Sequence, residues 1–206
     1  MTEMASADLT STLESFIGSG WLEWTGVFTG ILCVWLAAKN NILNWPVAIV
    51  NVSIYGLIFF DSKLYSDMGL QICFILINGY GWYYWSKRKD KTQQPAPVIN
   101  ISKSEIIISL ISILLLTTVS GFFLHQHTQA AYPYIDSFCT ACSLVAQALL
   151  ARRVIQNWLI WIAVDFIYVA VYISRDLKPT ALMYCIYIYI AWMGYREWKK
   201  TYIEQT

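Results

Sequence analysis

The sequence is poor in charged residues and has no long polar stretch. Charged residues make up 13% of the 206-residue chain and hydrophobic residues 57%, whereas a soluble domain carries about 25% charged residues. The longest polar stretch, residues 87–104, has the length of a loop. These deficits exclude a separate soluble domain and indicate an all-α polytopic membrane protein, for which no nucleic-acid partner is expected.

Two further absences exclude particular classes of membrane protein. The chain has no GxxxxGK[ST] loop, so nothing in it indicates coupling to ATP. The last apolar segment has no lysine in its interior, because Lys178 and Lys199 lie only at its ends. A retinal-type photoreceptor or pump needs such a lysine for its Schiff base, so this class is excluded.

The chain also lacks the residue sets of an enzyme. Its two histidines, His125 and His127, fall together in one predicted loop, and no Ser/His/Asp set or metal cluster lies at a common depth. Cys139 and Cys142 have C-x-x-C spacing without a second Cys or His pair, which favours small packing residues on one helix face. The sequence therefore predicts neither an enzyme nor a bound cofactor or metal.

Basic residues are missing from the start of the chain. Residues 1–19 contain acidic side chains and no lysine or arginine, so they lack the basic region that opens a secretory signal peptide. We therefore expect residues 1–19 to form an extracytoplasmic segment and the first apolar segment to remain in the mature protein.

Seven segments have the length and composition of membrane spans. A spanning helix needs about 20 mostly apolar residues, and several of the candidates are rich in Trp and Tyr. Trp45, Trp158 and Trp198 lie near predicted helix ends, which favours a belt at the membrane interface. The predicted spans are 20–38, 42–60, 66–86, 104–124, 134–151, 156–173 and 179–198.

The basic residues fall mostly on one side of these seven spans. Because cytoplasmic loops carry an excess of Lys and Arg, this bias predicts a periplasmic N-terminus and a cytoplasmic C-terminus. On the C-terminal side lie Lys39, Lys87, Arg88, Lys89, Lys91, Lys103, Arg152, Arg153, Arg196, Lys199 and Lys200. On the N-terminal side lie Lys63, Arg175 and Lys178.

The chain contains an internal repeat with an offset of 113 residues. At this offset Asn44-Trp45 meets Asn157-Trp158, Gly81 meets Gly194 and Trp85 meets Trp198. The predicted organisation is a three-helix repeat (20–88), a cytoplasmic loop (89–103), a linker helix (104–124) and a second three-helix repeat (133–200). One linker helix between two triplets makes the repeats parallel, as in the sugar-transporting SWEET proteins, with the substrate site between them.

Asp165 lies in the middle of the sixth span. It is eight residues beyond Asn157, which places it about 12 Å into the bilayer at 1.5 Å per residue. A carboxylate there costs roughly 2.5–3.5 kcal/mol on insertion scales and marks a functional site by default. No lysine or arginine lies at a similar depth, so a cationic ligand is one partner for it; a protonated or hydrogen-bonded Asp that ties helices together is the alternative.

Aromatic residues share the helix face of this carboxylate. Trp161, Asp165, Tyr168 and Tyr172 follow i, i+4, i+7 and i+11 spacing. Ring faces attract a positive charge and the carboxylate neutralises it, so the stripe predicts a site for a flat cation; ordinary packing is the alternative. Four amides at depth are further candidates, either as ligand contacts or as interhelical hydrogen bonds: Asn51, Gln71, Asn78 and Gln147.

Two runs, 65–89 and 136–172, resemble the bacterial PnuC family of vitamin transporters. The clearest motifs are Leu70-Gln71, Tyr80-Gly81-Trp82 with Trp85, Asp136-Ser137, and Asn157-Trp158-x-x-Trp161-x-x-x-Asp165. The resemblance covers about residues 20–200 and adds Trp82 to the candidate substrate contacts.

The resemblance implies a seven-helix, SWEET-like fold in the bacterial inner membrane. It implies facilitated diffusion of nicotinamide riboside, trapping by an intracellular vitamin kinase, and a homotrimer. Relatives in the family carry thiamine or riboflavin. The charge argument admits nicotinamide riboside and thiamine, which are both flat cations, and disfavours neutral riboflavin. Proton coupling through Asp165 remains an alternative to uniport.

Overall fold

The fold is all-helical in the part of the chain that the structure, a computed structural model, describes: residues 21–61, 65–87, 97–128, 132–174 and 178–205. The predicted segment 1–19, most of the predicted loop 89–103, Lys63 and Arg175 lie outside these residues. The described helices are α2 (Trp21–Ala38), α3 (Asn44–Asp61), α4 (Tyr65–Lys87), α5 (Lys103–His127), α6 (Pro133–Ala151), α7 (Asn157–Ser174) and α8 (Lys178–Gln205).

The helix ends agree closely with the ranges predicted from sequence, with two notable differences. Helix α8 continues to Gln205, beyond the predicted end at residue 198. Helix α5 continues to His127, so the prediction of a loop at His125 and His127 is wrong, and both lie in its last turn. The helices end later than hydropathy predicts because a helix can continue past the apolar core into polar surroundings.

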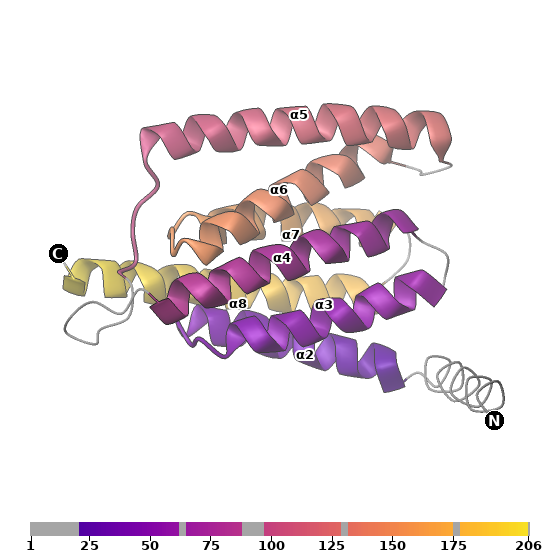
Figure 1. Cartoon of the computed structure of the whole chain (residues 1–206). Coiled ribbons are helices and arrows are strands. Elements are labelled where there is room, and N and C mark those ends of the chain that lie inside the picture. The colour runs from indigo at the N-terminus through magenta and orange to yellow at the C-terminus, as the bar shows by residue number, and fades with distance from the viewer. Residues whose placement is uncertain (1–20, 62–64, 88–96, 129–131, 175–177, 206) are drawn as a thin grey trace, which may run out of the picture.

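The helices run back and forth as one bundle, and the N-terminal end of α2 and the C-terminal end of α8 lie at opposite ends of it (Figure 1). Helix α3 packs between α2 and α4, and α7 packs between α6 and α8. We call α2–α4 the first half and α6–α8 the second half. The halves meet through α2 with α8 and through α4 with α6, whereas α5 lies on the outside and packs only on α6 among the described helices.

Four of the described helices are long and apolar enough to cross a membrane: α3, α5, α6 and α7. The apolar part of α2, Trp24–Ala38, is shorter. Helix α5 is the most apolar of the four, and Gly121 is its one residue among the buried positions. An apolar helix with almost no buried face has to be covered by lipid or by another protein, which marks the chain as a multi-pass membrane protein.

Local sequence explains where α5 begins and how the segment before it is fixed. Ser102 caps α5, and Glu105 returns a hydrogen bond to the Ser102 backbone, forming a capping box. Upstream, Ile99 exchanges backbone hydrogen bonds of 3.0 Å with Arg153 and Ile155 in the α6–α7 connection. The segment that leads into α5 is therefore attached to the second half at this end.

Four tryptophans form the centre of the contact between the halves. Trp45, Trp158 and Trp198 are 0%, 1% and 0% exposed, so the prediction that they form an interface belt is wrong. Trp45 meets Trp85 edge-on at 5.2 Å between ring centroids, and Trp158 meets Trp198 edge-on at 5.5 Å. Trp85 and Trp198 are 6.0 Å apart, which joins the two pairs into one cluster.

Each half repeats the local contacts of the other at positions 113 residues apart. A Cβ at Gly81 would clash with the Trp45 ring, and one at Gly194 would clash with the Trp158 ring. Each tryptophan therefore needs a glycine on the neighbouring helix, because only glycine lets that helix approach the indole so closely.

Hydrogen bonds between the halves follow the same pattern. The indole of Trp85 donates to the Ala151 carbonyl oxygen, and the indole of Trp198 donates to the Ala37 carbonyl oxygen, both at 3.1 Å. Asn40 and Arg153 are the described non-glycine residues with positive φ, at 55° and 61°. They are also 113 residues apart, and Arg153 Nη2 donates to Asn40 Oδ1 at 2.7 Å.

Candidate substrate site

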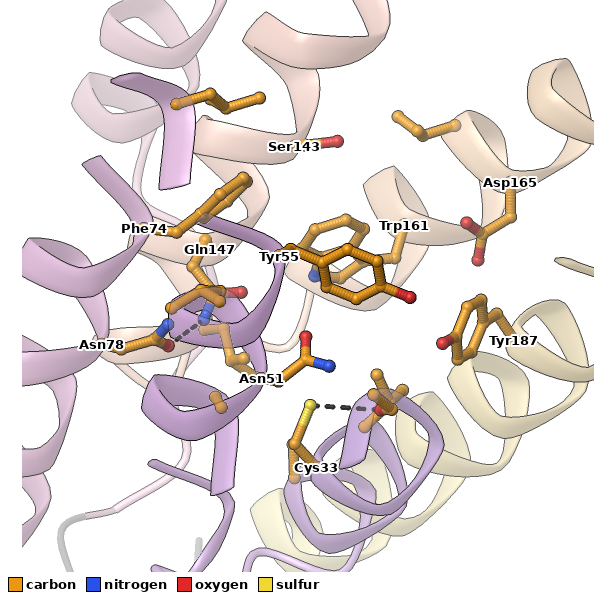
Figure 2. Close-up of a pocket in the computed structure, with 18 of the residues that line it drawn as sticks. Cys33, Asn51, Tyr55, Phe74, Asn78, Ser143, Gln147, Trp161, Asp165 and Tyr187 are labelled. Carbon is orange, nitrogen blue, oxygen red and sulfur yellow. Dashed lines mark hydrogen bonds between the residues drawn. The ribbon is translucent and has the colours of Figure 1, made fainter. Parts of the chain in front are cut away.

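A cavity of about 470 Å³ lies between the two halves (Figure 2). Its walls come from α2, α3 and α4 on one side and α6, α7 and α8 on the other. A volume of this size is typical of sites for small organic ligands.

The face of α7 that carries the carboxylate forms one wall of the cavity. Trp161, Asp165, Tyr168 and Tyr172 all line it. Asp165 is 6% exposed, and its carboxyl group points into the cavity (Figure 2). No described residue makes a hydrogen bond or an ion pair with this carboxyl group. The side chain is thus buried, acidic and directed at an open space.

The four predicted amides line the same cavity, but they differ in how they are held. Gln147 Nε2 on α6 donates to Asn78 Oδ1 on α4 at 2.7 Å, which ties the two halves together. Asn51 Nδ2 donates to the Gly26 carbonyl oxygen at 2.6 Å and to Thr29 Oγ1 at 3.0 Å, which ties α3 to α2. Gln71 makes no hydrogen bond with another described residue, so its amide is available to a ligand.

Trp82, the remaining candidate, does not line the cavity. It lies one turn beyond Asn78, the last α4 residue in the lining, and is 43% exposed. In this structure it belongs to the outer surface of the bundle.

Sequence reasoning missed several residues of the lining, above all the tyrosines of α8. Tyr184 packs against Tyr168 at 5.0 Å and Tyr172 at 5.2 Å between ring centroids, and Tyr187 meets Tyr184 edge-on at 5.8 Å. These rings extend the α7 stripe into a continuous aromatic wall. The i, i+3 spacing of Tyr184 and Tyr187 was the available signal, but neighbouring Tyr189 is 60% exposed, so composition alone cannot sort them.

The cavity is acidic. Asp67, in the first turn of α4, joins Asp165 in the lining, and no lysine or arginine is among the described residues that line it. Arg153, the buried arginine among the described residues, lies instead in the α6–α7 connection, over the Trp85 ring at 4.3 Å. Burial lowers the pKa of Arg153 to about 10, so it stays protonated at neutral pH. The cavity therefore attracts positive charge.

The cysteine pair on α6 has a packing environment. Cys139 and Cys142 are 0% and 5% exposed and form a buried cluster with Val164 of α7. Among the described residues no group of three His, Cys, Asp or Glu side chains is placed to hold a metal ion.

A membrane bundle with two three-helix halves and a cavity between them has the architecture of a small-molecule transporter. The family comparison makes the assignment specific. Residues 20–200 match the family model described as "Nicotinamide mononucleotide transporter", and the chain belongs to this family.

Relatives and a solved structure agree with this assignment. The nicotinamide riboside transporter PnuC of Escherichia coli (strain K12) is 28% identical, over 88% of this chain and 88% of the relative. The riboflavin/roseoflavin transporter RibM of Streptomyces davaonensis is 23% identical, over 86% of this chain and 84% of the relative. A crystal structure of the vitamin B3 transporter PnuC has a TM-score of 0.72 at 24% identity, covering 97% of this chain and 89% of that chain, and so shows the same fold.

Proposed function

We propose that this protein takes up nicotinamide riboside across the bacterial inner membrane by facilitated diffusion. The observation that carries the proposal is the Asp165 carboxyl group, which is 6% exposed, faces the cavity and has no partner among the described residues. Membership of the family and the name of the Escherichia coli relative support the choice of substrate.

The cavity has complementary chemistry for each part of this substrate. The flat, cationic pyridinium ring stacks against Trp161 and the tyrosine wall, and Asp165 balances its charge. At an effective dielectric near 20, a cation about 4 Å away gains up to ~4 kcal/mol before desolvation. The ribose hydroxyls and the carboxamide are hydrogen-bonded by Gln71, Asn78 and Gln147.

The seven helices all span the membrane and form a 3+1+3 arrangement of two parallel repeats, as in the SWEET proteins. The matching contacts at an offset of 113 residues support this organisation. The contacts between the halves also support it: α6 is the equivalent of α2 and α8 is the equivalent of α4, so the α2–α8 contact corresponds to the α4–α6 contact. Transport then proceeds as the halves rock about the tryptophan cluster and expose the cavity alternately to each side. No step uses ATP.

The end of the bundle that carries the described basic side chains is cytoplasmic, by the positive-inside rule. At this end lie Lys39, Lys87, Lys103, Arg152, Arg153, Arg196, Lys199 and Lys200. The chain works as a homotrimer, as the family resemblance implies. A cytoplasmic kinase phosphorylates the nucleoside, and the charged product no longer fits the acidic cavity.

A charge-specific binding experiment tests the role of Asp165. We expect Asp165→Asn to weaken binding of nicotinamide riboside about tenfold while the melting temperature stays within about 2 °C. The control ligand is dihydronicotinamide riboside, which has nearly the same shape and no charge, and its affinity should change less than about twofold. An equal loss for both ligands, or for neither, would contradict the charge-matching role.

Flux into proteoliposomes tests the mechanism. Purified protein without any ion gradient should equilibrate nicotinamide riboside across the membrane. Failure to equilibrate it, with uptake restored by an imposed proton gradient, would instead support proton coupling through Asp165.

Thiamine is the second candidate substrate, because its thiazolium ring is also flat and cationic. The riboflavin/roseoflavin relative shows that transporters similar to this chain carry different vitamins. A binding panel of nicotinamide riboside, thiamine and riboflavin against the purified protein separates the candidates. We expect nicotinamide riboside to bind at least about tenfold more tightly than the other two.

A further inference from the structure

A second hollow, of about 380 Å³, lies at the basic end of the bundle between α2 and α8. It is separate from the central cavity, since the two share no lining residue. Lys39, Arg196 and Lys200 line it, against the single carboxylate of Glu197. The hollow therefore carries an excess of positive charge.

These cations have few partners within the chain. Lys39 forms no ion pair with a described residue. Lys200 is 3.8 Å from Glu204, but the two side chains are 73% and 64% exposed, so water screens the pair strongly. Arg196 lies over the Trp192 ring at 4.8 Å. An anion entering the hollow would thus meet three cations, which the carboxylates of Glu197 and Glu204 among the described residues only partly neutralise.

The other side of the hollow is aromatic and apolar. Tyr189, Trp192 and Met193 line it, and Tyr189 and Trp192 are 60% and 47% exposed. Trp192 and Tyr189 lie one and two turns before Arg196 on α8, so the apolar rings continue from the basic end of the bundle toward the middle of the helix. The combination of cations on one side and apolar rings on the other fits a molecule with a phosphate group and an acyl chain.

The equivalent position in the other half explains why the hollow is open. Lys39 corresponds at the 113-residue offset to Arg152, whose guanidinium is 2.8 Å from the Glu105 carboxylate of α5. Helix α5 packs on α6 and on no other described helix. Helix α5 thus supplies an acidic partner to one half, and none of the described helices supplies one to Lys39 in the other half.

We propose that this hollow binds the phosphate group of an anionic phospholipid. The lipid phosphate takes, beside α2, the place that the Glu105 carboxylate has beside α6. Basic pockets between membrane helices on the cytoplasmic side are suited to such headgroups. The site stands apart from the transport cavity and from the identity of the vitamin.

Native mass spectrometry of the full-length protein, titrated with phosphatidylglycerol, tests this site. Because each Lys or Arg near an anionic lipid surface contributes about fivefold to affinity, the double variant Lys39→Gln/Arg196→Gln should bind about 25-fold more weakly. A matched control, Lys103→Gln/Lys199→Gln, removes the same charge from exposed positions outside the hollow and should lose less than about threefold. Equal losses in both variants would overturn the proposal.

Four further measurements complete the test. The charge-conserving variant Lys39→Arg/Arg196→Lys should bind the lipid within about threefold of the unchanged protein, which shows that any loss is not a folding defect. Neutral phosphatidylcholine should bind equally to all variants. Inorganic phosphate or glycerol 3-phosphate that displaced the lipid at equal concentration would overturn the lipid assignment in favour of a soluble phosphate. A changed oligomeric state in the Gln double variant, with lipid binding retained, would overturn it in favour of contact with a second copy.

Discussion

The two halves share a frame and differ in the side chains that line the cavity. On α7 the lining face carries Trp161, Asp165, Tyr168 and Tyr172, and on α3 the positions 113 residues earlier also line the cavity. Those positions are Ala48, Val52, Tyr55 and Phe59. The equivalent faces of α3 and α7 thus line the cavity from opposite halves, and of these two faces only that of α7 carries a carboxylate.

The cavity-lining residues of α4 and α8 also differ between the halves. Gln71, Phe74 and Asn78 of α4 correspond to Tyr184, Tyr187 and Ala191 of α8, and all six line the cavity. Among these six positions the first half supplies two amides, Gln71 and Asn78, and the second half supplies two tyrosines, Tyr184 and Tyr187. The rocking of the halves proposed above relies on the matching contacts, whereas the different linings distinguish the two ends of a bound ligand.

The shared tryptophan cluster should give the largest and the most equal effects. Trp85→Ala and Trp198→Ala each remove a buried ring and a 3.1 Å hydrogen bond between the halves, and each should cost about 3–5 kcal/mol of stability. Denaturant unfolding in detergent measures both. Loss of stability in one variant alone would contradict the prediction that the two tryptophans have equivalent roles in the two halves.

Exchanging Asn40 and Arg153 tests that equivalence more directly. Arg153→Asn and Asn40→Arg each disrupt the 2.7 Å hydrogen bond to a buried guanidinium, and each should cost about 2–3 kcal/mol, as expected for a bond to a charged group. In the double exchange the arginine moves to the matching left-handed position, from which it can stack on Trp198 as Arg153 stacks on Trp85. The same unfolding assay should show that the double exchange recovers all but about 1 kcal/mol, and additive losses would contradict the proposed symmetry.

The helices and the α7 wall could be predicted from sequence because simple periodicities determine them. Bilayer thickness sets the length of each apolar segment, and residues at i, i+4, i+7 and i+11 share a face wherever the helix packs. Periodicity does not say where along a face a cavity ends, so Trp82, one turn past Asn78, could not be sorted from the lining residues.

The tryptophans were harder to place for a different reason. A Trp near a helix end suits an interface belt or a packed core equally well, and only its neighbours decide. Trp45 became buried because Gly81 lets the helices approach. The repetition of both residue types 113 positions later was the signal for a core contact, but which residues touch depends on how the helices pack, which one-dimensional spacing does not give.

Moving the carboxylate from one half to the other should sharpen the comparison at the site. Asp165→Val should weaken nicotinamide riboside binding about tenfold. Adding Val52→Asp places a carboxylate at the matching position on the opposite wall, and the double variant should recover affinity to within about threefold. Calorimetric titration of both variants measures this. A double variant that binds no better than Asp165→Val would mean that position 52 does not face the substrate as position 165 does.

The smallest effect concerns the charge at the basic end. Arg152 and Glu105 form an ion pair at 2.8 Å with side chains 47% and 11% exposed, so Glu105→Gln should cost only about 0.5 kcal/mol, as expected for a partly exposed pair. Thermal unfolding at low and high salt measures it, and the difference from the unchanged protein should shrink as salt screens the pair. Lys39, at the matching position, has no such partner in the part of the chain that the structure describes, so Lys39→Gln should leave the melting temperature in pure detergent unchanged and lower it only in anionic lipid. A drop in pure detergent would mean that Lys39 has an anionic partner within the protein. The positive charge of Lys39 would then be neutralised by the protein, as that of Arg152 is by Glu105.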